Sequence, residues 1–309
     1  MAVTLKELTK HEELLSPGHR GCAGCSGANV IRQVLLATEH PVVCTCATGC
    51  LEVVTTIYPY TAWRTPFIHS AFENSAATIS GIETAYRALK KKGKISEEIK
   101  FIAIGGDGGT YDIGLQALSG ALERGHDFLY VCYDNGAYMN TGIQRSGSTP
   151  CGAATSTSPA GSVIPGKVQN RKDLTAIAAA HNIPYLAQVS IHNWRDLTTK
   201  VRKALSYEGP AFINALAPCY RGWRFPSEES IEIARLAVDT CFWPLFEIDH
   251  GKYTVNYKPR EKKPLEEWLN KQGRFAHLFK DEKHKGIVEN LQSEVDNKWE
   301  ELLRKSEET

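Results

Sequence analysis

The sequence lacks long apolar runs and has almost no excess of either charge. No stretch of its 309 residues is apolar over the length that a bilayer crossing requires, and the first fifteen, MAVTLKELTKHEELL, lack the apolar core of a signal peptide. We therefore expect a cytoplasmic protein. The 36 basic side chains are balanced by 35 acidic ones and form no long basic stripe, so neither nucleic acid nor a membrane is an expected partner.

The sequence also lacks the even number of cysteines that a disulfide framework would have. The chain has nine cysteines, and thiols in a cytoplasmic protein of this length stay reduced. Their spacing therefore has to be examined for thiolate ligands. With 42% hydrophobic and 23% charged residues, the chain is expected to be a globular α/β protein rather than a disordered one.

Strand and helix patterns alternate along most of the chain. Helices are expected within residues 27–38, 74–91, 112–124, 172–181 and 193–206, and buried strands within 40–46, 100–109, 127–135, 185–189 and 210–216. This alternation is typical of an open, mostly parallel sheet with helices on both faces.

The alternation sets the expected domain organisation. Residues 1–245 are expected to form one domain. The charged residues 246–309 are expected to form a C-terminal arm that packs on a partner subunit, with a solvated terminal helix as an equal alternative. The stretch 136–166 is rich in glycine, serine and proline without periodicity, so we expect a loop that covers a ligand.

Glycines and oxygen-bearing side chains mark the ends of two successive strands. Gly106, Asp107 and Gly108 end one strand, and Asn135 ends the next, 28 residues after Asp107. A carboxylate, an amide oxygen and the backbone carbonyl of Ala137 are the hard ligands that Mg²⁺ prefers. The glycines let backbone N–H groups approach phosphate oxygens, and the following helix points its positive end the same way. The pattern predicts a diphosphate bound through Mg²⁺ more strongly than a simple tight turn.

Four cysteines are candidate ligands of one metal centre. Cys22 and Cys25 form a C-x-x-C pair, Cys50 follows 25 residues later, and Cys219 stands in a turn after a strand. Such thiolates suit zinc or a 4Fe–4S cluster, and the spacing does not distinguish the two. The other cysteines have different expected roles: buried positions in or beside strands for Cys44, Cys46 and Cys132, a free thiol for Cys151, and a less favoured fourth ligand for Cys241.

Six segments of the chain resemble the β subunit of the pyruvate or oxalate (2-oxoacid):ferredoxin oxidoreductases. They are PGHRGCAGC, ATGCLEV, WRTPFIHSAFENSAA, GDGGTYDIGLQALSGALERG, YDNGAYMNTGIQRSGSTP and APCYRGW. The resemblance covers roughly residues 15–245 and implies the thiamine diphosphate-binding fold. It implies an oxidoreductase in which thiamine diphosphate serves the oxidative decarboxylation of pyruvate or oxalate, with electrons passed through a 4Fe–4S cluster to ferredoxin. The alternatives are a non-redox thiamine decarboxylase subunit and a zinc-bearing scaffold subunit.

The resemblance also implies residue roles. It assigns Cys22, Cys25, Cys50 and Cys219 to the cluster and Asp107, Asn135 and Ala137 to Mg²⁺. Asn140 would stabilise charge on the substrate oxygen as the catalytic residue. The full implied cofactor-binding set is Gly27, Thr48, Cys50, Gly106, Asp107, Gly108, Gly109, Asn135, Gly136, Ala137, Tyr138, Asn140 and Thr141.

One part of a thiamine enzyme is missing from this chain. The glutamate that protonates the aminopyrimidine ring lies on a separate domain in the family, and no second domain is evident here. The chain is therefore expected to act in a heteromeric complex whose other subunits supply this glutamate, further clusters and part of the substrate pocket. Ser26 stands where family members commonly have glycine, so pyruvate and oxalate both stay open, as does the use of coenzyme A. The cluster implies an oxygen-sensitive, anaerobic enzyme.

Overall fold

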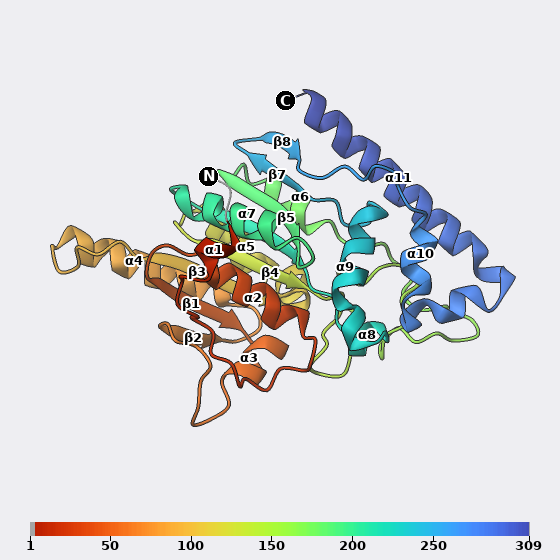
Figure 1. The fold of residues 1–309 in the computed structure, drawn as a ribbon, viewed down its shortest axis with the longest axis horizontal. Helices are drawn as coiled ribbons and strands as arrows, with labels where there is room; N and C mark the ends of the chain where they lie inside the picture. Colours follow the sequence, from red (N-terminus) through yellow and green to blue (C-terminus); the bar gives the residue numbers. More distant parts are fainter. Residues whose placement is uncertain (1–3, 309) are drawn as a thin grey trace.

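The protein is built around one eight-stranded sheet (Figure 1). The structure, a computed structural model, describes residues 4–308. The strand order is β2-β1-β3-β4-β6-β5-β7-β8, and all neighbours are parallel except the last two pairs, which are antiparallel. The strands are β1 (Val42–Ala47), β2 (Phe67–Ser70), β3 (Lys100–Gly106), β4 (Leu129–Asp134), β5 (Tyr185–Ser190), β6 (Ala211–Leu216), β7 (Phe246–Asp249) and β8 (Lys252–Val255).

Helices connect these strands and flank the sheet. In chain order they are α1 (Leu5–Leu8), α2 (Ser26–Leu36), α3 (Cys50–Thr55), α4 (Ser75–Lys91), the π-helix η1 (Gly108–Ile113), α5 (Leu115–Glu123), α6 (Leu174–Ala179), α7 (Trp194–Ser206), α8 (Tyr220–Trp223), η2 (Ser227–Glu229), α9 (Ser230–Asp239), α10 (Leu265–Asn270), η3 (Gly273–Phe279), η4 (Glu282–His284) and α11 (Lys285–Glu308). Among the described residues, none of these helices combines the length and the apolar character needed to cross a membrane.

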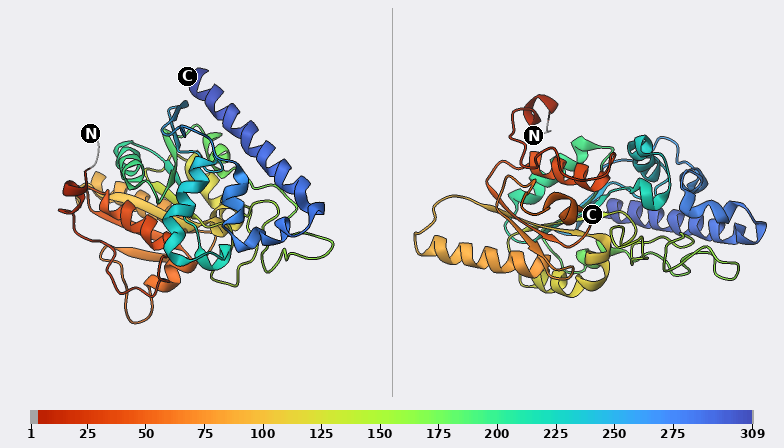
Figure 2. Two further views of the ribbon diagram at one scale, coloured as in Figure 1. Left: turned by 45° about the vertical axis from the view of Figure 1, so that its right-hand side comes forward. Right: turned by 90° about the horizontal axis from the view of Figure 1, so that it is seen from below.

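The central strands are buried on both faces, which explains their continuous apolar sequences. Along β4, Val131 and Tyr133 pack with side chains of α2 and α7, whereas Tyr130 and Cys132 pack with side chains of α4, α5 and α6. Successive strand residues point to opposite faces, so each apolar run supplies two cores. The two helix layers on either side of the sheet are visible in Figure 2. The predicted α/β fold, with a mostly parallel sheet between helices, is confirmed.

The helix expected from residue 112 begins earlier and in a different geometry. The chain turns into the π-helix η1 directly after Asp107, and the N–H of Gly114 donates to the carbonyl of Gly109 at 2.8 Å. Single π turns are rare and occur often at functional sites. Here the π turn is formed by the residues that directly follow β3 and Asp107. The loop 136–166 contains no helix and no strand, as expected.

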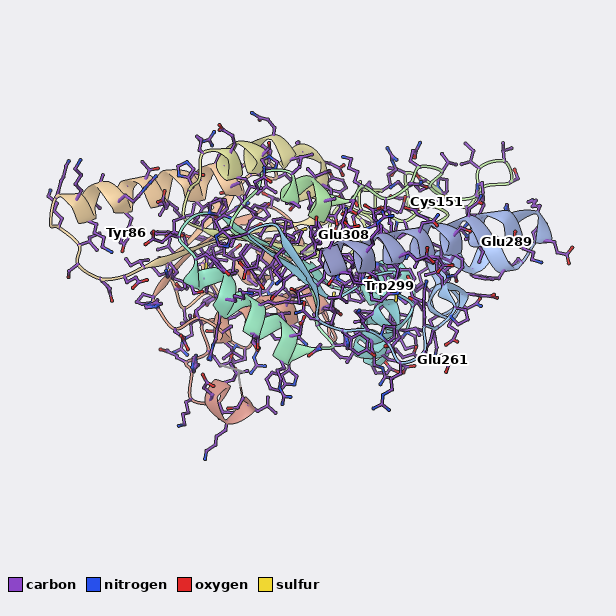
Figure 3. All side chains as sticks on the ribbon, turned by 90° about the horizontal axis from the view of Figure 1, so that it is seen from above. Tyr86, Cys151, Glu261, Glu289, Trp299 and Glu308 are labelled. Atoms are coloured by element: carbon purple, nitrogen blue, oxygen red, sulfur yellow. The ribbon has the colours of Figure 1, made fainter. Side chains whose placement is uncertain are left out.

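The C-terminal segment shares the sheet and the core of the rest of the chain. The expected boundary at residue 245 falls just before β7, which pairs with β5, and β8 then pairs with β7. Leu291, Val295 and Leu302 of the long helix α11 are buried. Cys151 of the long loop lies beside this helix (Figure 3). The expected contact of residues 246–309 with another subunit stays a prediction.

Candidate functional site

The candidate site lies where the connections of the sheet diverge. From β1 the chain continues to its neighbour β2 on one side, and from β3 it continues to its neighbour β4 on the other side. In open α/β sheets, ligands bind outside the carboxyl ends of the strands at such a switch point. All residues of the implied cofactor-binding set except Gly27 and Gly136 line one pocket there, together with Gly49, Phe72, Tyr133 and Met139.

The three oxygen atoms expected to bind Mg²⁺ lie together in this pocket. The side-chain amide of Asn135 reaches to 2.8 Å from the carbonyl oxygen of Ala137 and 2.9 Å from Oδ1 of Asp107. When the amide oxygen faces these atoms, three oxygens meet and only a cation can hold them together. When the NH₂ group faces them, it donates to both and the site is satisfied without a cation. This donor set fits a hard divalent cation.

Asp107 is 1% exposed, and its surroundings disfavour a bare carboxylate. Burial raises the pKa of Asp107 well above its usual range, and the neighbouring Asp134 raises it further. The hydroxyl of Ser146 donates to Oδ2, and the backbone N–H of Asn135 donates to Oδ1 at 3.2 Å. These two bonds orient the carboxylate, and a divalent cation would supply the positive charge that favours its ionised form.

The glycines after β3 are required by close packing. A Cβ atom on Gly108 would lie 2.3 Å from the ring of Tyr138, and one on Gly109 would lie 3.0 Å from the carbonyl oxygen of Phe72. The hydroxyl of Tyr138 donates to the carbonyl of Gly108 at 2.8 Å. A side chain at residue 108 would therefore displace the tyrosine that covers this turn. The expected contact of these glycines with phosphate stays a prediction.

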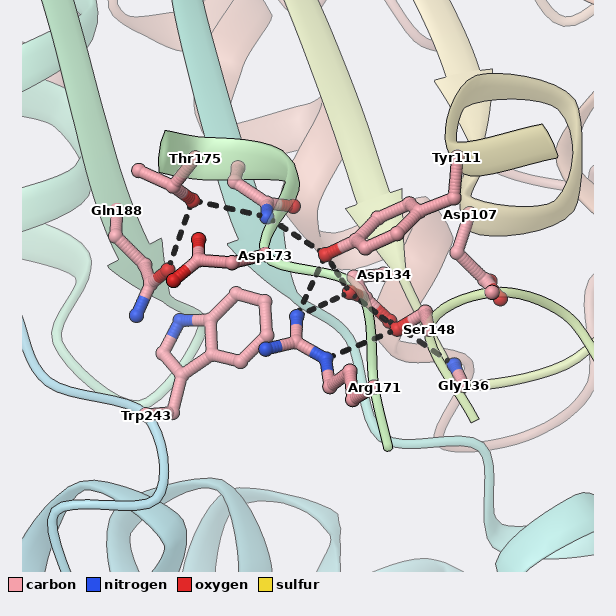
Figure 4. Close-up of polar contacts among 12 residues, drawn as sticks. Asp107, Tyr111, Asp134, Gly136, Ser148, Arg171, Asp173, Thr175, Gln188 and Trp243 are labelled. Atoms are coloured by element: carbon pink, nitrogen blue, oxygen red, sulfur yellow. Dashed lines mark hydrogen bonds and ion pairs between the residues drawn. The ribbon is translucent and has the colours of Figure 1, made fainter. Parts of the chain in front are cut away.

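A buried polar network holds the turn that carries Asn135 and Ala137 (Figure 4). The carboxylate of Asp134 accepts hydrogen bonds from the hydroxyl of Tyr111 at 2.6 Å and from Arg171 Nη2 at 2.8 Å. It also accepts from the hydroxyl of Ser148 and, at 3.0 Å, from the backbone N–H of Gly136. Because Asp134 precedes Asn135 directly, the network fixes the backbone that presents the oxygen ligands.

The four candidate cluster ligands interact with one another electrostatically. Burial, together with smaller contributions from Cys219, Cys25, Asp107 and Cys22, raises the pKa of Cys50 to about 12. Cys22 is exposed, and the other three are partly buried. In the described part of the chain, no three His, Cys, Asp or Glu side chains are close enough to hold a single metal ion.

Two of these thiols stand at helix starts. Cys25 is the N-cap residue of α2 and Cys219 that of α8. Burial raises the pKa of both thiols, and hydrogen bonds from backbone groups of the first helical turn lower it. The backbone hydrogen bonds act in the direction that favours the metal-binding thiolate, although burial outweighs them in the free thiols. Gly27 lies in the first turn of α2, where an added Cβ would be 4.0 Å from the sulfur of Cys25.

The remaining cysteines lie apart from this group. Cys44, Cys46 and Cys132 are fully buried within strands, as expected. Cys151 contacts the carbonyl of Val168. The charged groups that act on Cys241 are carboxylates and Lys262 rather than other thiols, which disfavours it as a fourth ligand.

Comparisons with known proteins agree with this geometry. The family profile of the thiamine pyrophosphate enzyme C-terminal TPP-binding domain matches residues 24–215. Pyruvate synthase subunit PorB of Thermotoga maritima is 53% identical, with an alignment covering 100% of this chain and 98% of the relative. The same subunit of Methanocaldococcus jannaschii is 56% identical over 93% of this chain and 95% of the relative. This chain belongs to the PorB family of 2-oxoacid:ferredoxin oxidoreductase β subunits.

Two further proteins, one known by sequence and one by a solved structure, are similar at lower identity. Ketoisovalerate oxidoreductase subunit VorB of Pyrococcus abyssi is 45% identical over 96% of this PorB-family chain and 94% of the relative. The solved structure of 2-oxoglutarate:ferredoxin oxidoreductase from Magnetococcus marinus matches with a TM-score of 0.55 and 19% identity, covering 72% of this chain and 79% of that one. At this identity the match shows the shared fold. The family expected from the six sequence segments is confirmed.

Several residues around this PorB-family site cannot be recognised from the sequence alone. Ser146 and Ser148 come from the long loop, where serine is common, and Arg171 comes from a segment before α6. Arg274, whose Nη1 would lie 2.9 Å from a Cβ on Gly136, comes from the C-terminal segment. A lone arginine far from any motif carries no sequence signal, so only the fold connects it with the site.

Proposed function

We propose that this chain is the thiamine diphosphate-binding subunit of a complex that oxidatively decarboxylates pyruvate and passes the electrons to ferredoxin. Mg²⁺ would be held by Asp107, Asn135 and the carbonyl of Ala137, and a 4Fe–4S cluster by the four candidate cysteines. Thiamine diphosphate supplies the electron sink for decarboxylation when it is bound. The family membership supports the reaction class, and the site geometry supports the residue assignments.

One observation carries this proposal: Cys50 belongs to both sites. Its side chain lines the same pocket as Asp107, and its sulfur is within electrostatic reach of the three other candidate thiols. A residue in the wall between a diphosphate pocket and a thiolate group is well placed for short-range electron transfer. A thiamine decarboxylase without redox chemistry would have no use for this arrangement.

The resemblance to the family favours a cluster over zinc, because the segments that carry Cys22, Cys25, Cys50 and Cys219 match those that carry the cluster ligands there. The four thiols influence one another electrostatically. Four thiolates are also the ligand set that a 4Fe–4S cluster requires. We therefore assign them to the cluster.

Pyruvate is the substrate that the comparisons favour. The PorB relatives are named for pyruvate synthase, while the VorB relative is named for ketoisovalerate. Asn140 and Thr48 line the pocket and can donate hydrogen bonds to the oxygens of a 2-oxoacid. A branched 2-oxoacid is the second candidate, on the basis of the VorB relative alone. None of these relatives is named for oxalate.

Other subunits complete the site in this proposal. They would supply the glutamate that activates the cofactor, further clusters and the contact surface for ferredoxin. The printed names describe the relatives as subunits, which supports a heteromeric enzyme.

The test is chemical analysis of the anaerobically purified complex. Iron, sulfide, zinc, magnesium and thiamine are quantified, and the visible spectrum is followed while pyruvate, 2-oxoisovalerate or oxalate is added separately with coenzyme A. We expect iron, sulfide and thiamine without zinc, and bleaching with pyruvate. Stoichiometric zinc with no bleaching by any of the acids would refute the redox assignment. Preferential bleaching by 2-oxoisovalerate or oxalate would retain the class and change the substrate.

A further inference from the structure

A buried arginine from the C-terminal segment carries a positive charge that no carboxylate pairs. Arg274, in η3, is 2% exposed. Its Nε donates to the side-chain oxygen of Gln272 at 2.9 Å, whereas its Nη2 is buried without a hydrogen-bond partner. Among the described residues, no Asp or Glu lies within ion-pair distance of this guanidinium.

Arg274 lies between the two proposed cofactor sites. Its guanidinium stacks on the indole ring of Trp223, 3.9 Å from the ring centroid, and Trp223 ends the short helix that begins after Cys219. The indole Nε1 donates to the carbonyl of Asn135 at 2.6 Å. On its other side, Arg274 occupies the space that a side chain at residue 136 would need. This close approach explains why Gly136, expected to bind the cofactor, faces the arginine instead of the pocket.

A buried charge of this kind is costly unless opposite charge offsets it. Burial is the main cause that lowers the pKa of Arg274 to about 9, and Asp134, Cys219 and Asp107, in that order, offset part of its effect. Asp134 is already paired with Arg171 at 2.8 Å. The thiol of Cys219 becomes negative when it ligates iron, so loading the cluster supplies the missing negative charge.

We propose that Arg274 is the buried counter-charge of the iron-sulfur cluster and raises its reduction potential. The reduced cluster carries one more electron than the oxidised cluster, so a nearby fixed positive charge stabilises the reduced state more strongly. Because Arg274 is buried, the dielectric around its charge is low, which strengthens this interaction. Arg274 does not line the candidate pocket, so it would act by electrostatics and not as a catalytic residue. The inference rests on the proposed cluster.

The test compares two substitutions in the assembled complex. Arg274→Met removes the charge and keeps a long apolar side chain, whereas Arg274→Lys keeps the charge and loses the planar stack on Trp223. Cluster potentials are measured by redox titration followed by electron paramagnetic resonance. The signal of this cluster is identified as the one that Cys219→Ser alters, and clusters of the other subunits are internal controls.

We expect Arg274→Met to move the potential of this cluster to a more negative value, Arg274→Lys to stay near wild type, and the other clusters to be unchanged. If Arg274→Met prevents cluster assembly while Arg274→Lys permits it, the charge requirement is supported as well. An intact cluster of unchanged potential in Arg274→Met overturns the inference, and so does equal loss of the cluster in both variants. If the Cys219→Ser complex shows the same cluster signals as the wild-type complex, the cluster of the proposed function is refuted instead.

Discussion

At the scale of single residues, the proposed Mg²⁺ ligands are oriented by groups that would not contact the cation themselves. Asp107 takes its orientation from Ser146 and from the backbone of Asn135, while Asp134 fixes the following turn. Outer contacts of this kind commonly tune metal affinity. Removing a ligand and removing its support should therefore have effects of different size.

The first prediction concerns the ligand itself. Asp107→Asn replaces a carboxylate oxygen by a neutral amide, and we expect Mg²⁺-dependent binding of thiamine diphosphate to be lost. Stability without the cofactor should not fall, because burial and the nearby Asp134 already disfavour a charge at this position. Calorimetric titration of the complex with the cofactor and Mg²⁺ measures the binding. Asp127→Asn, just before β4 and therefore at the opposite ends of the strands, is the control. Wild-type affinity in Asp107→Asn would remove this residue from the metal site.

The second prediction concerns Ser146, whose side chain orients Asp107. Ser146→Ala removes the hydroxyl that donates to Oδ2 of Asp107, and we expect the apparent affinity for Mg²⁺ to fall about 10-fold. Ser156→Ala, in the exposed part of the same loop, should leave the affinity unchanged. The affinity is read from the Mg²⁺ dependence of cofactor binding. Equal behaviour of the two variants would show that Ser146 does not position the ligand.

At the scale of elements, the strands were the most predictable part of the fold. The apolar runs of β3, β4 and β6 predicted buried parallel strands. Because the carboxyl ends of parallel strands meet at one edge, the residues after β3 and β4 predicted where the candidate pocket lies. The π-helix after Asp107 was not predicted, since its geometry follows from packing against Tyr138 and Phe72. The antiparallel strands β7 and β8 were missed because their four-residue sequences are too short to show a period.

The third prediction compares alanine substitutions at two helical glycines. Gly108→Ala in η1 would place a Cβ 2.3 Å from the ring of Tyr138, so we expect a displaced turn and weaker binding of thiamine diphosphate. Gly81→Ala in α4 meets open space, so it should raise the free energy of unfolding by about 0.5–1 kcal/mol. Thermal unfolding and cofactor titration of both variants test this pair. Unchanged cofactor binding in Gly108→Ala would show that the turn tolerates a side chain.

At the scale of the whole molecule, the C-terminal segment is part of the domain that holds the site. It adds β7 and β8 to the sheet, covers the core with Trp268 and Phe275, and brings Arg274 between the two proposed cofactor sites. A segment with these contacts contributes to folding whether or not it also meets another subunit. The sequence-based division at residue 245 thus separates two parts of one sheet.

The fourth prediction follows from this shared core. A chain ending at residue 245 would leave β5 as an unprotected edge strand and expose the apolar side chains that pack against α10 and η3. We expect it to aggregate and to fail to join the complex, because the lost contacts belong to its own core. Removal of residues 307–309 alone should leave folding and assembly intact, since Leu302, the last buried residue of α11, is retained. Co-expression with the other subunits, followed by size-exclusion chromatography, measures both outcomes. A truncated chain that stays folded but no longer assembles would show that residues 246–309 act mainly as a docking arm, whereas one that neither folds nor assembles would confirm that they belong to the core of the domain.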